Sequence, residues 1–295
     1  MTIQDERPAE PPAAAPARSG HGGVKAIEDW TTGWVKRHPM ASVDTVGDQF
    51  ILGVRTIQWF FIDLFTGKFQ WQEFVRQGAF MAGTSVLPTI LVALPIGVTL
   101  SIQFALLAGQ VGATSLAGAA SGLVVIRQAA SLVSAVLMAA AVGSAITADL
   151  GSRKMREEID AMEVMGVSPI QRLVVPRFVA CLVVGILLTG ITCFVGFLAG
   201  YAFNIYLQNG TPGSFVSTFA SFATVEDLVL ALVKSIVFGA IVAIVACHKG
   251  LSTRGGPAGV ANSVNAAVVE AVLLLMTVNV LMTQLYVLLF PRATL

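Results

Sequence analysis

Length, composition and charge exclude most classes of protein for this chain. It has 295 residues, of which 55% are apolar and only 12% are charged, and its formal net charge is +1. Soluble domains carry about 25% charged residues, so this chain has too little polar surface to cover a water-soluble globule. Its near-neutral charge gives no basic excess for binding nucleic acid. We therefore exclude a soluble enzyme, a collagen-like chain and a disordered chain.

The charged residues leave long apolar stretches between them. Asp, Glu, Lys and Arg are absent from residues 77–126, 128–148 and 178–225. Uncharged apolar runs of about 18 residues or more predict membrane-spanning helices. Lys and Arg gather before residue 77, between residues 153 and 177, and near residue 250. Because Lys and Arg are enriched in cytoplasmic loops, these three segments are predicted to lie in the cytoplasm.

These patterns predict an all-α polytopic membrane protein with five transmembrane helices, a cytoplasmic N-terminus and an extracytoplasmic C-terminus. A polar, disordered tail is expected over residues 1–42, an interfacial helix region over 43–76 and a five-span domain over 77–295. A turn over 108–122 and a loop over 208–227 would connect spans on the outer side. The predicted spans are 80–106, 123–147, 179–207, 228–246 and 266–290.

The region before the first span predicts a two-faced helix. On a helical wheel of about 100° per residue, one side is apolar and the opposite side is charged. The apolar side holds Phe50, Val54, Ile57, Phe61 and Leu64. The charged side holds Asp48, Arg55 and Asp63. We expect this helix to lie in the inner membrane surface; the alternative is a soluble helix docked on a partner.

The segment over 149–166 is the most densely charged in the chain, and it predicts a cytoplasmic helix between spans 2 and 3. Gly166 suits its C-terminal cap, and Pro169 prevents its continuation. Met155, Ile159 and Met162 form a narrow apolar ridge. A solvated connector is one interpretation, but a Met-containing ridge favours docking into a groove of another protein.

Several ordered motifs in this part of the chain resemble a known signature. Gly-Ser-Ala-Ile-Thr-Ala-Asp-Leu-Gly occupies 143–151, Glu-Glu-Ile-Asp-Ala-Met-Glu-Val-Met-Gly occupies 157–166, and Pro169 and Pro176-Arg177 follow. Together they resemble the MlaE/YrbE permease family, in its actinobacterial YrbE branch, over about residues 75–290. Members of that family are membrane subunits of ABC-type lipid transporters that act with MCE proteins. Many relatives carry Arg-Glu-Leu-Gly-Pro where residues 127–131 here read Arg-Gln-Ala-Ala-Ser.

The resemblance implies a fold, partners and a site. It implies five spans preceded by an interfacial helix, in the plasma (inner) membrane. The implied partners are a cytoplasmic ABC ATPase, a second permease subunit (a YrbE paralogue, forming a heterodimer), MCE proteins on the outer side and a lipid substrate. The segment over 149–166 would be the coupling helix that sits in the ATPase. Its coupling residues would be Arg153, Met155, Glu157, Glu158, Ile159, Asp160, Met162 and Glu163.

The sequence predicts no catalytic chemistry in this chain. The phosphate-binding loop of ATPases, Gly-x-x-x-x-Gly-Lys-Ser/Thr, does not occur in it, so a separate polypeptide would hydrolyse ATP. Neither a nucleophile–base set nor a metal-ligand spacing is visible, since Cys181, Cys193 and Cys247 are isolated in or beside apolar runs. We therefore assign no catalytic residue, metal, cofactor or nucleic-acid partner.

Three ionisable residues fall within or near the spans, where charges are costly. Arg127 and Lys234 are expected near the outer surface. They either extend towards the water or face the subunit interface or outer mouth, where they would contact a substrate or partner. Glu270 is expected to cap the start of the last span.

Three functions remain open from the sequence. The leading hypothesis is the permease subunit of an ATP-driven lipid import complex. An ion-coupled secondary transporter is the second, supported only by Pro88 and Pro95 as possible helix breaks in the first span. A membrane scaffold for extracytoplasmic MCE proteins, without a transport role, is the third.

Overall fold

The computed structural model describes residues 45–67, 69–110, 112, 122–208 and 211–289. The chain divides into two units, residues 1–48 and residues 49–295. The predicted tail over 1–42 and most of the predicted turn over 108–122 lie outside the described residues. Most of the described part of the chain is helical, and this part holds no strand.

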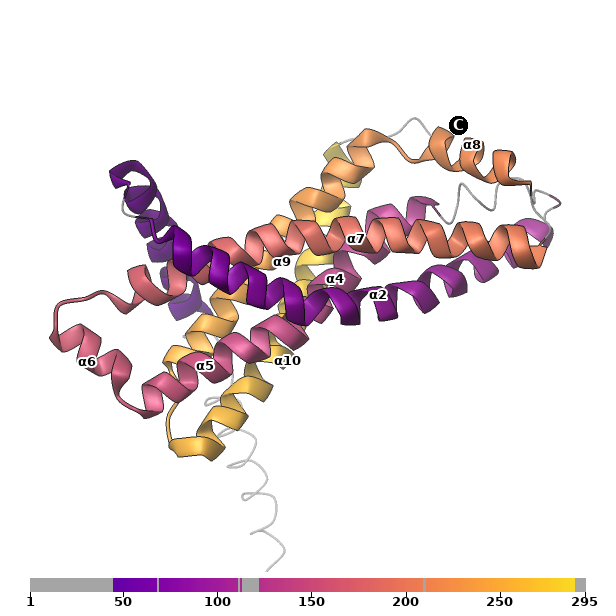
Figure 1. Ribbon diagram of the computed structural model, residues 1–295. Helices are drawn as coiled ribbons and strands as arrows, with labels where there is room; N and C mark the ends of the chain where they lie inside the picture. Colours follow the sequence, from indigo (N-terminus) through magenta and orange to yellow (C-terminus); the bar gives the residue numbers. More distant parts are fainter. Residues whose placement is uncertain (1–44, 68, 111, 113–121, 209–210, 290–295) are drawn as a thin grey trace, which may run out of the picture. The chain divides into compact units, whose positions relative to one another are not determined.

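The helices follow one another through the chain with short connections (Figure 1). A first helix covers 45–66, and α2 covers Trp71–Gln110. One long helix then runs over Gly122–Met155 and contains η2 (Val125–Ala129), α4 (Ala130–Met138), η3 (Ala139–Gly143) and α5 (Ser144–Met155). The remaining elements are α6 (Glu158–Val164), η4 (Ile170–Val174), α7 (Val175–Gln208), α8 (Pro212–Phe222), α9 (Val225–Leu251) and α10 (Gly256–Leu289).

Five of these helices are long and apolar enough to cross a membrane. They are Trp71–Gln110, Gly122–Met155, Ile170–Tyr206, Val225–Leu251 and Gly256–Leu289. The chain is therefore a multi-pass membrane protein of the all-α class, and the predicted number of spans is confirmed. The helices extend beyond the predicted spans because a helix does not have to end where the hydrocarbon core of about 30 Å ends.

Close helix contacts hold the spans together at small residues. Helices α2 and α7 pack along each other (Figure 1). A Cβ atom at Gly97 of α2 would lie 2.9 Å from the Gly196 carbonyl oxygen of α7. A Cβ at Gly239 of α9 would lie 3.0 Å from the Cys181 carbonyl oxygen of α7. The missing side chains at these glycines therefore allow α2 and α9 to pack closely against the backbone of α7.

Three π-helical segments interrupt the regular α-helices. Segments η2 and η3 lie within the long helix over Gly122–Met155, and η4 precedes α7. A π turn widens the helix and displaces its backbone groups, and such turns are frequent at functional sites. The charged clusters described below include residues of η2 and η4.

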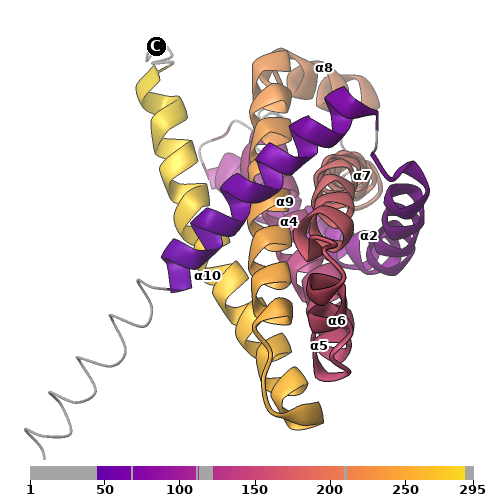
Figure 2. The same cartoon turned by 90° about the vertical axis from the view of Figure 1, so that its left-hand side faces the viewer.

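The first helix packs against the bundle with its more polar face. A Cβ at Gly53 would lie 3.0 Å from the Ile244 side chain of α9, and Gln171 Nε2 donates to Asp63 Oδ1 at 2.6 Å. Figure 2 shows this helix crossing α10 and α9. The predicted apolar stripe faces away from the chain and is exposed: Phe50, Val54, Ile57, Phe61 and Leu64. Its position in a membrane surface stays a prediction.

Helix α8 lies where the sequence predicted only a loop. It begins at Pro212, a residue suited to the first turn of a helix. Phe215 is buried, and the Phe219 ring lies 4.6 Å from the Phe197 ring of α7, edge to face. Aromatic contacts with α7 therefore stabilise this short helix.

Candidate functional site

Two charged clusters lie at opposite ends of the long helix over Gly122–Met155. The α6-end cluster comprises Asp149, Arg153 and Arg177 and the charged residues beside them, Glu73, Arg76 and Arg172. The α8-end cluster comprises Arg127, Asp227 and Lys234. Each cluster joins segments that are distant in the sequence.

The predicted helix over 149–166 is in fact two helices joined by a tight turn. Helix α5 ends at Met155, and α6 begins at Glu158. Between them Glu157 adopts a left-handed conformation with φ 59°, which non-glycine residues rarely adopt. Hydrogen bonds close the turn, since Arg156 N donates to Ser152 O at 3.2 Å and Glu157 N donates to Lys154 O at 3.0 Å.

The turn brings basic residues of α5 and the turn against acidic residues of α6. Arg156 Nε lies 2.8 Å from Glu158 Oε1, Arg153 Nη1 lies 4.0 Å from Glu158 Oε2, and Lys154 pairs with Asp160. Asp149 precedes Arg153 by four residues, which is the favoured order for an ion pair along a helix. The pair is present, with 3.2 Å between Asp149 Oδ2 and Arg153 Nε. The ion pairs therefore hold α6 against the end of α5.

The turn also breaks the predicted apolar ridge. Ile159 is only 3% exposed, Met155 is 43% exposed, and Met162 is half-buried. The exposed apolar surface lies instead at the end of α6, where Val164 is 90% exposed and Met165 is 70% exposed. The break at Glu157 is the reason, because residues on either side of it no longer share one helical face.

Two acidic side chains of this segment are exposed and unpaired. Glu157 and Glu163 are both exposed, and within the described residues no Lys, Arg or His nitrogen lies within 4.0 Å of either carboxylate. Glu158 and Asp160, by contrast, are occupied by ion pairs within the hairpin. The predicted coupling residues thus divide into those that shape the hairpin and those that face outwards.

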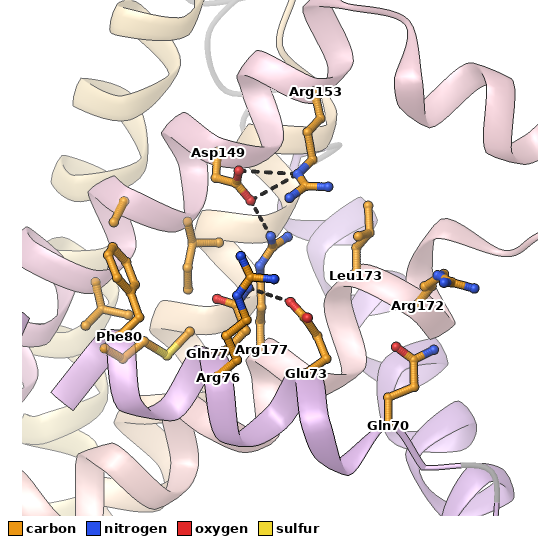
Figure 3. A pocket seen from close by; sticks show the side chains of 14 residues that line it. Gln70, Glu73, Arg76, Gln77, Phe80, Asp149, Arg153, Arg172, Leu173 and Arg177 are labelled. Atoms are coloured by element: carbon orange, nitrogen blue, oxygen red, sulfur yellow. Dashed lines mark hydrogen bonds and ion pairs between the residues drawn. The ribbon is translucent and has the colours of Figure 1, made fainter. Parts of the chain in front are cut away.

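A cavity of about 430 Å³ opens beside this hairpin, between α2, the long helix over Gly122–Met155 and η4 (Figure 3). Charged side chains line one part of it: Glu73, Arg76, Asp149, Arg153, Arg172 and Arg177. Apolar side chains line another: Phe80, Met81, Val142, Ala145, Ile146 and Leu173. Only Arg153 among these was singled out individually as a candidate site residue from the sequence.

Asp149 joins the hairpin to the neighbouring span. Its Oδ2 lies 3.2 Å from Arg153 Nε and accepts a hydrogen bond from Arg177 Nη2 of α7. Arg177 is only 2% exposed. Glu158, Arg153, Asp149 and Arg177 therefore form a continuous chain of charged contacts from α6 to α7.

At the α8 end, Lys234 lies inside the chain. Its side chain is 0% exposed. The ammonium donates to Arg127 O at 3.3 Å, a carbonyl in η2, and to Gln128 Oε1 at 3.2 Å. It also donates to Asn279 Oδ1 at 3.2 Å and to Thr283 Oγ1 at 2.8 Å, both in α10. Lys234 therefore does not extend to the outer surface, and it links three helices through neutral acceptors.

Arg127 is held by the same part of the chain. Its Nε lies 2.6 Å from Asp227 Oδ1, and the Asp227 side chain is fully buried. Asp227 also completes a capping box with Thr224 at the start of α9, which satisfies backbone donors there. Contact of Arg127 or Lys234 with a substrate or partner stays a prediction, and the interactions present are internal.

Glu270 does not have the capping role expected of it. Helix α10 begins at Gly256, so Glu270 lies well inside the helix. It forms an ion pair with Lys249 of α9 at 2.7 Å and accepts a hydrogen bond from Gln49 of the first helix. The prediction of a cap was wrong because α10 starts earlier than its apolar stretch. Glu270 instead ties the first helix, α9 and α10 together.

The family comparison agrees with the fold and with the motifs. A family model described as Permease MlaE matches residues 74–285. The chain belongs to the MlaE permease family. The predicted resemblance is thereby confirmed, whereas assignment to the actinobacterial branch stays a prediction. The matched region of this permease includes α6, the α8-end cluster, and all of the α6-end cluster and cavity lining except Gln70 and Glu73.

Of three curated relatives of the permease, two are named as ABC transporter permeases. A probable ABC transporter permease protein of Synechocystis is 32% identical over 225 residues, 76% of this chain and 86% of the relative. One of Rickettsia typhi is 30% identical over 159 residues, 54% of this chain and 61% of the relative. The chloroplastic protein TRIGALACTOSYLDIACYLGLYCEROL 1 of Arabidopsis thaliana is 30% identical over 208 residues, 69% of this chain and 58% of the relative.

The described residues offer no group of three or more His, Cys, Asp and Glu side chains that could hold a metal ion. Cys181 and Cys247 are buried free thiols, and Cys193 is half-buried. What the described charges can do is form ion pairs and bind an oppositely charged partner. The α6 end, where acids and arginines are partly exposed, is therefore the candidate functional site.

Proposed function

We propose that this permease is the transmembrane subunit of an ATP-driven lipid import complex. A separate cytoplasmic ABC ATPase would hydrolyse ATP, a second permease subunit would pair with this one, and MCE proteins would act on the outer side. Membership of the MlaE permease family and the names of its relatives support the transporter class. The lipid named in the Arabidopsis relative supports a lipid cargo.

The observation that carries the proposal is the outward-facing surface of the α5–α6 hairpin. Glu157 and Glu163 present unpaired carboxylates within the described residues, and Val164 and Met165 are exposed apolar side chains beside them. A surface with an apolar centre and charged neighbours is typical of a docking site for another protein. We propose that the ATPase binds here.

The internal contacts of the hairpin suit it to transmit a movement. The ion pairs of Glu158 and Asp160 fix α6 to the end of α5, and α5 is the end of a membrane-spanning helix. Asp149 and Arg177 then join that helix to α7. A displacement of α6 by the ATPase would therefore move two spans together.

The same proposal fixes an orientation in the plasma (inner) membrane. The α6 end carries most of the described Lys and Arg residues outside the spans, which favours a cytoplasmic position. The N-terminus would then be cytoplasmic and the C-terminus extracytoplasmic, since five spans separate them. Cysteine accessibility at Val164→Cys in intact cells tests this orientation directly.

The decisive experiment reverses the unpaired charges of the hairpin. We expect the double variant Glu157→Lys, Glu163→Lys to insert normally and to lose both copurification of the ATPase and ATP-dependent lipid transport in reconstituted vesicles. Arg254→Glu is the matched control, because Arg254 is exposed at the connection between α9 and α10 and outside the hairpin. Normal transport by the double variant would contradict the proposal.

The α2 helix weighs against an ion-coupled secondary transporter. Pro88 and Pro95 lie within one uninterrupted helix, Trp71–Gln110, so they do not create the broken helix that such transporters use at mid-membrane. Transport that proceeds on a pH gradient without ATP would nevertheless favour that function. If labelled lipid moved neither with ATP nor on a pH gradient, the result would favour a membrane scaffold without a transport role.

A further inference from the structure

The cavity at the α6 end carries more positive than negative charge. Four arginines and two carboxylates line it. Glu73 accepts a hydrogen bond from Gln77 at 2.8 Å, and Asp149 is shared by Arg153 and Arg177. Within the described residues, neither Arg76 nor Arg172 lies within 4.0 Å of a carboxylate, as the ion pairs there all involve other residues.

The most buried arginine of the cavity lacks one acceptor. Arg177 Nη2 donates to Asp149, but Arg177 Nη1 is buried and has no hydrogen-bond partner among the described residues. Buried polar atoms are nearly always hydrogen-bonded, because an unsatisfied buried donor loses its hydration without compensation. Arg127 Nη2 at the α8 end is also buried without a partner among the described residues, but Arg177, and not Arg127, lines this cavity. The spare donor of Arg177 therefore lies beside a space that an anionic ligand can enter.

The lining of the cavity changes from charged to apolar in the same direction along two helices. Along α2, Glu73 and Arg76 are followed by Phe80 and Met81. Along the antiparallel long helix over Gly122–Met155, Asp149 is preceded by Ile146 and Val142. A ligand that fills the cavity would therefore meet arginines with one part and apolar side chains with another. An inorganic anion would contact only the charged part of the cavity. A phospholipid would contact the charged part with its phosphate and the apolar part with its acyl chains.

We propose that this cavity binds the phosphate group of a membrane phospholipid, with Arg76, Arg172 and Arg177 as its donors. Guanidinium groups match phosphate oxygens in pairs, and such charge-assisted hydrogen bonds are strong. The glycerol and the first acyl carbons would lie against Phe80 and Ile146. The ligand chemistry is the same for a transported lipid and for a resident lipid of the bilayer, and the inference rests on the proposed function only in treating the chain as a lipid-handling membrane protein.

The test measures ligand binding to the purified full-length permease in detergent by native mass spectrometry. The probes are dioctanoyl phosphatidic acid, dioctanoylglycerol, which lacks only the phosphate, and inorganic phosphate. We expect the phosphatidic acid to bind, and both other probes to bind at least about tenfold more weakly. Equal binding of dioctanoylglycerol would overturn the proposal. Inorganic phosphate binding as tightly as the lipid would overturn the lipid assignment in favour of a soluble phosphate.

Substitutions locate the site. Arg172→Gln and Arg76→Gln should each weaken phosphatidic acid binding by about tenfold, and Arg254→Gln, an exposed arginine outside the cavity, should leave it unchanged. Arg76 and Arg172 are exposed, so these variants avoid the folding defect that Arg177→Gln risks by leaving Asp149 with one partner fewer. Unchanged affinity in both cavity variants would overturn the proposal.

Lipid binding by the cavity and ATPase binding by the hairpin can be tested independently. Lipid binding to the isolated permease requires no ATPase, whereas copurification of the ATPase depends on the exposed face of α6. Loss of lipid binding in Arg172→Gln with normal ATPase copurification would support the cavity as the binding site. If the double hairpin variant keeps its ATPase while phosphatidic acid still binds the cavity, only the proposed coupling role fails.

Discussion

The two charged clusters of this permease lie at opposite ends of the same long helix and differ in how many of their charges are enclosed by the chain. At the α8 end, Lys234 is fully buried and makes four hydrogen bonds within the chain. At the α6 end, Arg177 is 2% exposed, and one of its guanidinium nitrogens has no partner within the described part of the chain, as is also true of Arg127 Nη2 at the α8 end. Around it, other arginines and acids remain exposed. Most charges at the α8 end are therefore enclosed in internal contacts, whereas more of those at the α6 end remain exposed and available for binding.

The difference follows from the surroundings of each charge. A buried ammonium is tolerated only when its donors are satisfied, and η2 supplies a backbone carbonyl, at Arg127, that an ordinary α-helix would use internally. The α6 end has fewer internal acceptors because two of its acids, Glu157 and Glu163, face outwards.

Asp227→Ala should destabilise the fold most. It leaves Arg127 without its buried counter-charge and removes the capping box of α9, and breaking a buried ion pair costs about 3–5 kcal/mol. The thermal unfolding of the purified protein measures the loss. Asp160→Ala, which breaks the exposed pair with Lys154, should cost less than about 1 kcal/mol. Equal losses in both variants would contradict the contrast between the clusters.

Asp149→Asn should have an intermediate effect on stability and a larger one on coupling. It weakens the contacts to Arg153 and Arg177, and a hydrogen bond to a charged group contributes about 1.5–3 kcal/mol. Because the link between the hairpin and α7 is lost, we expect the ATPase to copurify normally while less lipid is transported for each ATP hydrolysed. An unchanged ratio of transport to hydrolysis would exclude Asp149 from transmission.

Gln128→Glu should stabilise the α8 end. All four acceptors of the Lys234 ammonium are neutral, and a carboxylate at position 128 would supply its counter-charge. We expect a gain of about 1 kcal/mol. A double-mutant cycle checks the cause: in the Lys234→Met background the same substitution should destabilise, because it buries an unpaired charge. If Gln128→Glu changed the stability in the same direction in both backgrounds, Lys234 would not be the partner of the new carboxylate.

Glu157→Gly should change the local order of the hairpin and leave the stability of the rest of the fold unaffected. Its left-handed conformation costs a non-glycine residue about 1–2 kcal/mol, so glycine should leave the hairpin at least as well formed, whereas Glu157→Val should loosen it. Amide hydrogen exchange over residues 155–160 reports the result. Faster exchange in the glycine variant would mean that the carboxylate, rather than the backbone geometry, maintains the turn.

The class of this protein could be predicted from its amino-acid sequence. Five apolar runs long enough to cross a bilayer are a local property of the chain, and all five became spanning helices. The ordered motif around 143–177 likewise identified the family, which a match over 74–285 confirmed. The two faces of the first helix followed from its periodicity, and its apolar stripe is exposed as a membrane-facing helix requires.

Tertiary structure decided the contacts between distant segments. Only packing could place Lys234 among acceptors from η2 and α10, fold α8 onto α7, or split the charged segment at Glu157. The cavity likewise joins Arg76, Arg172 and Arg177 from three elements. Local patterns report the faces of one helix, whereas the burial and partner of a charge depend on which helices meet, and that is a property of the whole packed chain.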